Sequence, residues 1–236
     1  MGNIGEMEQT QNPEESLPTQ EGGEVKANSI ERLEGALESP EFMKNLHEQI
    51  ISSEHVKALG LEPSQHQVTE YLGLTKGGME YAAIKYGKDS VPENYTVCLD
   101  TWDKASGKRV DYVFYDKASD CVHVSAVHMA SVADAIGNPD IFIYEGHLGK
   151  MVAPEDSAFF GAMEECHHKK FFNEHPGYTP EDQANREGAD EIEQAWGVEL
   201  EQLAEELNIK TYSEDQFNPD TQQVFDPNHV KREPQA

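Results

Sequence analysis

The fold class of this chain depends on residues Tyr95–Tyr115, which read YTVCLDTWDKASGKRVDYVFY. Two runs rich in β-branched and aromatic residues flank the polar segment Asp103–Lys108, a pattern typical of a β-hairpin. The alternating run Cys121–Val127 and the apolar run Ile141–Tyr144 predict further strands. The sequence therefore predicts a short antiparallel meander of about four strands.

Helix signals lie on both sides of these strands. Proline stands at a first helical position, with acidic residues in the first turn, at Pro40, Pro154 and Pro180. Proline loses no helical hydrogen bond there, and the acids complement the helix dipole. Because the helices flank the strands instead of alternating with them, we expect an α+β fold with N-terminal and C-terminal helices.

The charge is strongly acidic and unevenly distributed. The 236 residues carry 45 Asp and Glu against 18 Lys and Arg, a formal net charge of −27. Residues 1–40 hold nine acids and two bases, residues 181–220 hold thirteen and two, and residues 71–180 hold sixteen and ten. Such a surface repels nucleic-acid backbones and anionic lipid and favours a basic protein partner.

Composition also predicts the organisation of the chain. The ends are poor in apolar residues and rich in Glu, Gln, Pro and Asn, so we expect them to be disordered. Three dispersed cysteines and no long apolar run favour a cytoplasmic protein without a membrane span. We expect a disordered leader at 1–28, a helical region at 29–90, a β-rich core at 91–150, C-terminal helices that pack on this core at 151–212 and a disordered tail at 213–236.

The leading functional hypothesis concerns the predicted helix from Asp190 to Glu206. Its apolar stripe contains Trp196, and this stripe can pack on the same domain or on a second copy, so the oligomeric state stays open. The carboxylates of its outer face could present a binding surface to a basic protein, as an inhibitor or DNA mimic does. The proposed partner-binding residues are Glu191, Glu193, Glu199, Glu201, Glu205 and Glu206.

A first alternative is a DNA-binding regulator. Residues 65–86 resemble a helix-turn-helix, with Leu72-Gly73-Leu74 at the turn. The nucleic-acid-binding residues would be Lys76, Tyr81, Lys85 and Lys88. Gly77 and Gly78 count against a second helix, and the segment has no arginine to contact guanine or phosphate. In the leading hypothesis we therefore expect no direct contact with nucleic acid.

A second alternative is a metal-binding enzyme that uses His and Cys of residues 121–128 and 164–175. Glu164 and His167 have the i, i+3 spacing of carboxylate-bridged metal sites, and Glu165 and His168 repeat it on an adjacent face. One ion could not take both pairs, and zinc motifs usually show two local ligand pairs. The candidate ligands are His123, His128, Cys166 and His167.

Other chemistry is weakly indicated. Cys121, His123 and Ser125 should share one strand face, where neighbours seldom reach each other in the geometry of a catalytic pair. Gly146–Lys150 lacks the spacing of a phosphate-binding loop and predicts a tight turn. We therefore expect no cofactor and favour a binding protein over an enzyme.

Overall fold

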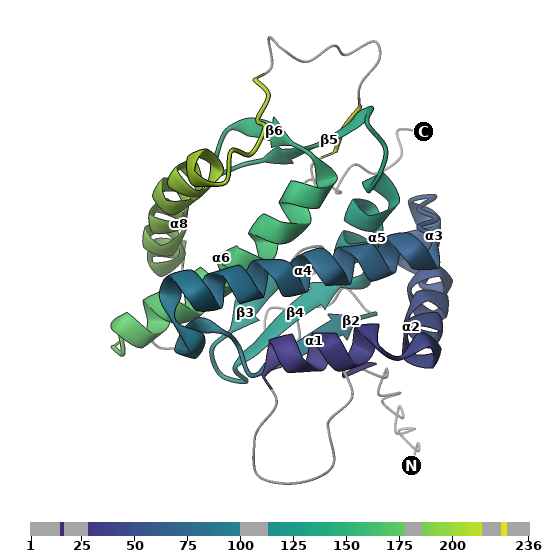
Figure 1. Ribbon diagram of the computed structural model, residues 1–236, viewed down its shortest axis with the longest axis horizontal. Helices are drawn as coiled ribbons and strands as arrows, with labels where there is room; N and C mark the ends of the chain where they lie inside the picture. The colour runs from purple at the N-terminus through teal and green to yellow at the C-terminus, as the bar shows by residue number, and fades with distance from the viewer. Residues whose placement is uncertain (1–14, 17–27, 100–112, 178–185, 214–222, 226–236) are drawn as a thin grey trace, which may run out of the picture.

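The structure is a computed structural model that describes residues 15–16, 28–99, 113–177, 186–213 and 223–225 (Figure 1). The helices are α1 (Ser29–Leu37), α2 (Pro40–Ser52), α3 (Glu54–Ala58), α4 (Gln65–Tyr86), the 3-10 turn η1 (Lys88–Ser90), α5 (Ala126–Ala135), α6 (Pro154–Glu174) and α8 (Arg186–Glu206). The strands are β1 (Glu15–Ser16), β2 (Asn94–Cys98), β3 (Val113–Asp116), β4 (Cys121–Ser125), β5 (Ile141–Glu145), β6 (Lys150–Val152) and β7 (Gln223–Phe225). This mixture of helices and small sheets confirms the predicted α+β class.

The helix starts follow local sequence signals. Helices α2 and α6 begin at Pro40 and Pro154, as predicted, whereas Pro180 lies outside the described residues. Reciprocal hydrogen bonds between Ser64 and Gln67 cap α4, and the same capping box joins Asn28 and Glu31 at α1. Each capping box satisfies two backbone donors locally, and at α1 the Ser29 N–H also donates to the Pro92 carbonyl at 3.1 Å.

The first sheet has the order β1-β2-β4-β3, and this order corrects the predicted meander. Strand β4 lies between β2 and β3, parallel to β2 and antiparallel to β3, so β2 and β3 do not form a hairpin. Strand β4 is the more buried strand, with Cys121, Val122, Val124 and Ser125 all shielded from solvent. A strand that is buried on both faces lies at the centre of a sheet. Its pairing with β2 joins segments that are far apart in the sequence, and local sequence patterns do not predict such pairing.

The second sheet has the order β6-β5-β7. Strands β5 and β6 form an antiparallel hairpin, and β7 pairs with β5 in parallel. Residues 146–149 form the turn of this hairpin, and Gly149 has a positive φ of 59° that favours glycine. The predicted tight turn is confirmed, and it presents His147 at its tip.

Helix α4 corrects the predicted helix-turn-helix. Residues Gln65–Tyr86 form one uninterrupted helix, and the expected turn at Leu72-Gly73-Leu74 lies in its interior. Buried side chains recur along the whole helix: Val68, Tyr71, Leu72, Thr75, Met79 and Ala82. This continuous burial outweighs the low helix propensity of the glycines, because tertiary packing routinely overrides propensity.

Helices α4 and α6 cross in direct backbone contact at Gly78. A Cβ atom at this position would overlap the carbonyl oxygen of Phe159 and would lie 3.0 Å from the Cβ of Ala162. Tyr81 packs edge-on against Phe159 on the next turn. The glycine that counted against a recognition helix is therefore the residue that lets α6 approach α4.

The core is a continuous apolar cluster that reaches from α1 to α8. It includes residues of α1, α2, α4, α5, α6 and α8 and of strands β2 and β4. Figure 1 shows α4 running across the middle of the molecule, with α8 at one side and the β5–β6 hairpin above it. Among the described helices, none combines the length and the apolar character needed to cross a bilayer.

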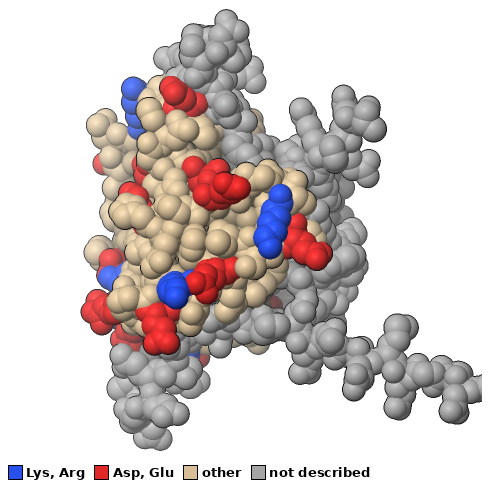
Figure 2. All heavy atoms as spheres, turned by 90° about the vertical axis from the view of Figure 1, so that its right-hand side faces the viewer, with Lys and Arg blue, Asp and Glu red and all other residues tan. Residues whose placement is uncertain are grey.

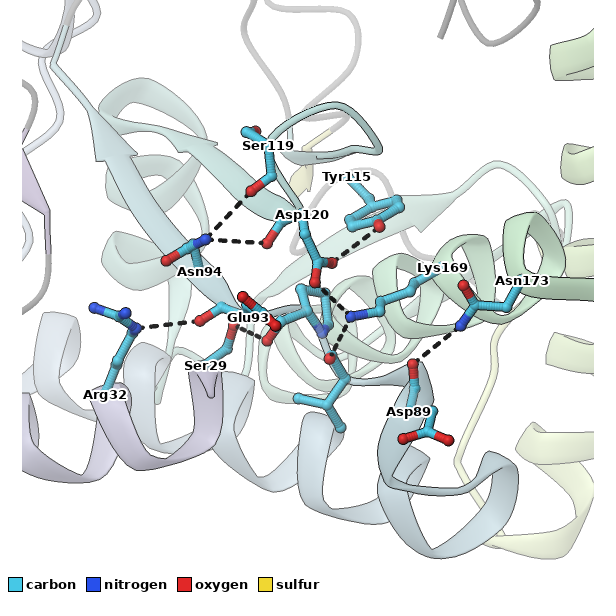
Figure 3. A network of polar contacts seen from close by, with 12 residues as sticks. Ser29, Arg32, Asp89, Glu93, Asn94, Tyr115, Ser119, Asp120, Lys169 and Asn173 are labelled. Atoms are coloured by element: carbon cyan, nitrogen blue, oxygen red, sulfur yellow. Dashed lines mark hydrogen bonds and ion pairs between the residues drawn. The ribbon is translucent and has the colours of Figure 1, made fainter. Parts of the chain in front are cut away.

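A polar network fixes the register of α6 against the first sheet (Figure 3). The Lys169 ammonium lies 2.7 Å from a carboxylate oxygen of Asp120 and donates to the Val91 carbonyl at 2.9 Å. The Tyr115 hydroxyl donates to the other Asp120 oxygen at 2.9 Å. Because Lys169 directly follows His168, this network also positions the C-terminal part of α6.

Substitution of Gly78 tests the helix crossing. We expect Gly78→Ala to lower the free energy of unfolding by about 1–3 kcal/mol, because the added methyl group meets backbone that cannot move without separating the helices. Chemical denaturation followed by circular dichroism measures this change.

The matched control is Gly77→Ala, where no atom lies within 4 Å of the added Cβ. We expect this control to be stabilised by up to about 1 kcal/mol through helix propensity. Equal effects of the two substitutions would contradict the assigned contact.

Candidate metal centre

Five potential metal ligands converge where α6, α8 and the β5–β6 turn meet. They form two groups that share Glu164: His147 with Glu164 and Glu193, and Glu164 with Glu165 and His168. The Nε2 atom of His147 lies 3.1 Å from Glu193 Oε2 and 3.6 Å from Glu164 Oε1. The Nε2 atom of His168 lies 3.9 Å from the same Glu164 oxygen. Both imidazoles therefore lie near one oxygen of Glu164, but among the described residues the group close enough to share an ion with His147 contains only Glu164 and Glu193.

Each element places its ligand through ordinary packing. On α6, Glu164 and His168 are four residues apart and so lie on one helix face. Helix α8 is held by the fully buried Trp196, which packs against the His167 ring with a centroid separation of 5.4 Å. Gly197 of α8 faces His147 closely enough that an added Cβ would contact its backbone. These contacts bring Glu193 and His147 to the α6 ligands.

Glu165 extends the cluster behind His168. Its Oε2 atom lies 3.5 Å from His168 Nδ1, the ring nitrogen opposite the one that faces Glu164. The Glu165 side chain is 3% exposed, whereas that of Glu193 is 42% exposed. The site is therefore closed on the Glu165 side and reaches solvent on the Glu193 side.

Unpartnered polar atoms concentrate in this region. Four buried side-chain atoms of α6 and α8 have no hydrogen-bond partner among the described residues: Glu165 Oε2, His167 Nδ1, His168 Nε2 and Trp196 Nε1. Buried polar atoms in folded proteins are normally paired, because an unmade hydrogen bond costs about 1–3 kcal/mol. Two of these atoms, Glu165 Oε2 and His168 Nε2, belong to the ligand cluster itself.

The cluster perturbs its own ionisation. Burial, followed by repulsion from Glu165, raises the pKa of Glu164 well above its usual value. The hydrogen bond with Glu193 raises the pKa of His147. Burial alone would raise the pKa of Glu193, but contacts with His147 and the neighbouring imidazoles outweigh it and lower that pKa. Every described ion pair of Glu164, Glu165 and Glu193 is with a histidine. Three carboxylates therefore share two imidazoles.

The four ligands predicted from sequence lie elsewhere. His123 is on β4 and stacks on Phe114, and His128 is half-buried in α5 beside Tyr71. Cys166 is fully buried in α6, where burial raises the pKa of its thiol. His167 packs between Trp196 and Tyr86, and burial lowers its pKa to about 4. Among the described residues, no group close enough to share an ion contains any of these four.

The six predicted partner-binding carboxylates divide into two sets. Glu193 faces His147, Glu199 accepts from the Tyr86 hydroxyl at 3.2 Å, and Glu206 lies 2.8 Å from the Lys85 ammonium. These three residues attach α8 to the rest of the molecule. The other three lie on the exposed side of the helix: Glu191, Glu201 and Glu205.

The predicted nucleic-acid-binding residues serve the packing of α4. Lys76 pairs with Glu80 at 2.7 Å, and Lys85 pairs with Glu206 and Glu199. Tyr81 packs on Phe159, and Lys88 is exposed in η1. With a single continuous α4, these side chains do not form a recognition helix.

The sequence indicates part of the site but not its assembly. It shows the i, i+3 spacing of Glu165 and His168, but it does not indicate the contribution of a distant hairpin turn. The acidic run that contains Glu193 favours a protein partner over a metal. The turn sequence around His147 carries no metal signal, so tertiary structure was needed to find it.

Comparisons with models of protein families, with curated proteins and with solved structures found no match to this chain.

The half-buried His128, whose Nδ1 atom is shielded from solvent and has no hydrogen-bond partner among the described residues, predicts an acid-sensitive fold. Burial lowers its pKa from 6.5 to about 4, so the unfolded chain takes up a proton at a higher pH than the folded chain does. This contribution to stability is therefore lost as the pH falls from 6.5 towards 4, by about 2 kcal/mol between pH 7.5 and pH 5. Denaturant unfolding at both pH values measures the loss. We expect it to shrink by that amount in His128→Gln and to persist in His66→Gln, whose side chain is 86% exposed. An unchanged pH dependence in His128→Gln would contradict the assignment.

Proposed function

We propose that this protein binds one divalent first-row transition metal ion, of the zinc type, through His147, Glu164, His168 and Glu193. The observation that carries the proposal is the group of His147, Glu164 and Glu193 from three separate elements, together with a second group that joins His168 and Glu165 to the same Glu164. Ligands about 2.0–2.1 Å from a tetrahedral zinc ion lie roughly 3.3 Å from one another. The separations of 3.1 and 3.6 Å within the group of His147, Glu164 and Glu193 are close to this value, and His168 Nε2 lies 3.9 Å from the shared Glu164 oxygen.

The position of Glu165 supports the same proposal. Histidines that bind a metal usually direct their second ring nitrogen to a carboxylate, which fixes the tautomer and the ring orientation. The His168 ring has this orientation, with Nε2 3.9 Å from Glu164 and Nδ1 3.5 Å from Glu165, although Glu165 Oε2 accepts no hydrogen bond from any described residue. Glu165 therefore has the place of an outer-shell residue that orients His168.

Charge balance also favours a cation. Glu164, Glu165 and Glu193 bring three carboxylates together, and burial, followed by repulsion from Glu165, raises the pKa of Glu164. A divalent ion would neutralise most of this charge. It would also bind the Nε2 atom of His168, which has no hydrogen-bond partner among the described residues. Imidazole donors favour zinc and similar metals over magnesium or calcium, which prefer oxygen ligands alone.

In the proposal, His168 joins His147, Glu164 and Glu193 as the fourth ligand of a tetrahedral shell. Such closed sites are typically structural. The proposed role of the ion is therefore to join α8 and the β5–β6 turn to α6. This role departs from the expectation that the protein uses no cofactor, and it agrees with the preference for a binding protein over an enzyme.

The acidic partner-binding hypothesis stays a prediction. It now concerns the exposed set Glu191, Glu201 and Glu205 instead of all six carboxylates. Figure 2 shows a different face, on which acidic side chains form separate groups and several lie beside a lysine or arginine. The acidic character of that face is therefore broken up, as it is at the α4–α8 contact through Lys85.

Calorimetric titration of zinc into chelator-treated protein tests the metal proposal. We expect one ion per chain, with affinity lowered at least about 100-fold in the double variant His147→Gln/Glu193→Gln, which removes two of the four ligands. Magnesium should not compete, because half of the donors are imidazole nitrogens.

The matched control is His66→Gln/Glu70→Gln. This exposed pair has a similar separation of 3.6 Å on α4 but lacks further ligands. We expect the control to bind zinc as the unmodified protein does. Absence of stoichiometric binding, or equal loss in both variants, would contradict the proposal.

A further inference from the structure

A second cluster of reactive side chains lies on the first sheet, away from the metal centre. Cys98 ends β2, and its Sγ atom lies 3.6 Å from Nδ1 of His123 on β4. This separation is within hydrogen-bond range for sulfur. Sequence reasoning grouped His123 with Cys121 and Ser125 of its own strand, whereas the structure pairs it with a cysteine of the neighbouring strand.

The parallel register explains this pairing. His123 lies opposite Thr96, and Cys98 is two residues further along β2 and therefore on the same face of the sheet. Cys121 contacts Thr96 at 3.4 Å and so belongs to this face as well. The intervening residues Val97 and Val124 point to the opposite face and enter the apolar core.

The imidazole is held in place for this contact. The Phe114 ring of β3 stacks on His123 with a centroid separation of 5.0 Å and an interplanar angle of 11°. Phe114 and His123 are directly paired in the antiparallel register of β3 and β4. The nucleophile, the base and the group that orients the base thus come from three adjacent strands, which is the arrangement of an activated thiol.

The three cysteines differ in access. Cys98 is half-buried, whereas Cys121 is 4% exposed and Cys166 is fully buried. A thiol reacts as the thiolate, and a neighbouring imidazolium favours this form. Cys98 therefore combines access to solvent with a neighbouring base, and Cys121 and Cys166 serve as internal references.

We propose that Cys98 and His123 form a nucleophilic thiol site that takes ligands with an electrophilic carbon that carries a leaving group, such as alkyl or acyl donors. With the ring proton on Nε2, the Cys98 thiol gives its proton to Nδ1 of His123. The sulfur electron pair then forms the new S–C bond, the bond from carbon to the leaving group breaks, and the leaving group departs with that electron pair. The imidazolium returns its proton to the leaving group or to solvent.

Alkylation by iodoacetamide tests the site, with each cysteine quantified by peptide mass spectrometry. At pH 7 we expect Cys98 to react about tenfold faster in the unmodified protein than in His123→Gln. We expect the two buried cysteines to react slowly in both proteins. Circular dichroism establishes whether the variant keeps its fold.

The pH profile of the unmodified protein gives a test that needs no variant. We expect the Cys98 rate to be half-maximal below pH 8.5, the midpoint of an ordinary thiol. A profile centred at 8.5 or above, equal Cys98 rates in a folded His123→Gln variant, or a Cys98 that does not react would each overturn the proposal.

Discussion

The close crossing of α4 and α6 at Gly78 is the contact on which the rest of the structure depends. It brings two long helices together along their buried faces, with Phe159 and Ala162 against the glycine. Helix α6 then provides the surface on which α8 packs through Trp196, and it carries Glu164, Glu165 and His168. A larger residue at position 78 would displace the helix that holds most of the candidate metal ligands. The packing of the helices and the proposed metal site therefore both depend on a glycine at position 78.

The candidate metal centre illustrates how buried charge is managed. Three carboxylates lie together with two histidines, and Lys169, one residue beyond His168, is instead bound to Asp120 and the Val91 carbonyl. Histidine compensates carboxylate charge only when it is protonated. The pKa of His147 is raised and that of Glu164 is raised, both of which reduce the net negative charge of the cluster. In the proposed account, a divalent ion takes over this compensation and leaves both imidazoles neutral.

Local patterns predicted the α+β class and the starts of α2 and α6, because proline and acidic first turns act within one helical turn. They did not predict α5, which is buried on nearly all sides and so lacks an amphipathic period. They also misassigned β2 and β3 as a hairpin, since the insertion of β4 between them is a long-range event. The same limit applies to the site: the spacing of Glu165 and His168 was visible, but its completion by His147 and Glu193 required the tertiary fold.

X-ray absorption spectroscopy of the zinc-loaded protein tests the central claim most directly, because it reports the type and number of ligands. The account predicts four nitrogen or oxygen neighbours at about 2.0–2.1 Å, with the outer-shell scattering of two imidazoles and no sulfur. A sulfur neighbour at about 2.3 Å would instead indicate a cysteine ligand such as Cys166. That result, or a shell of six oxygen atoms without imidazole, would contradict a site formed by His147, Glu164, His168 and Glu193.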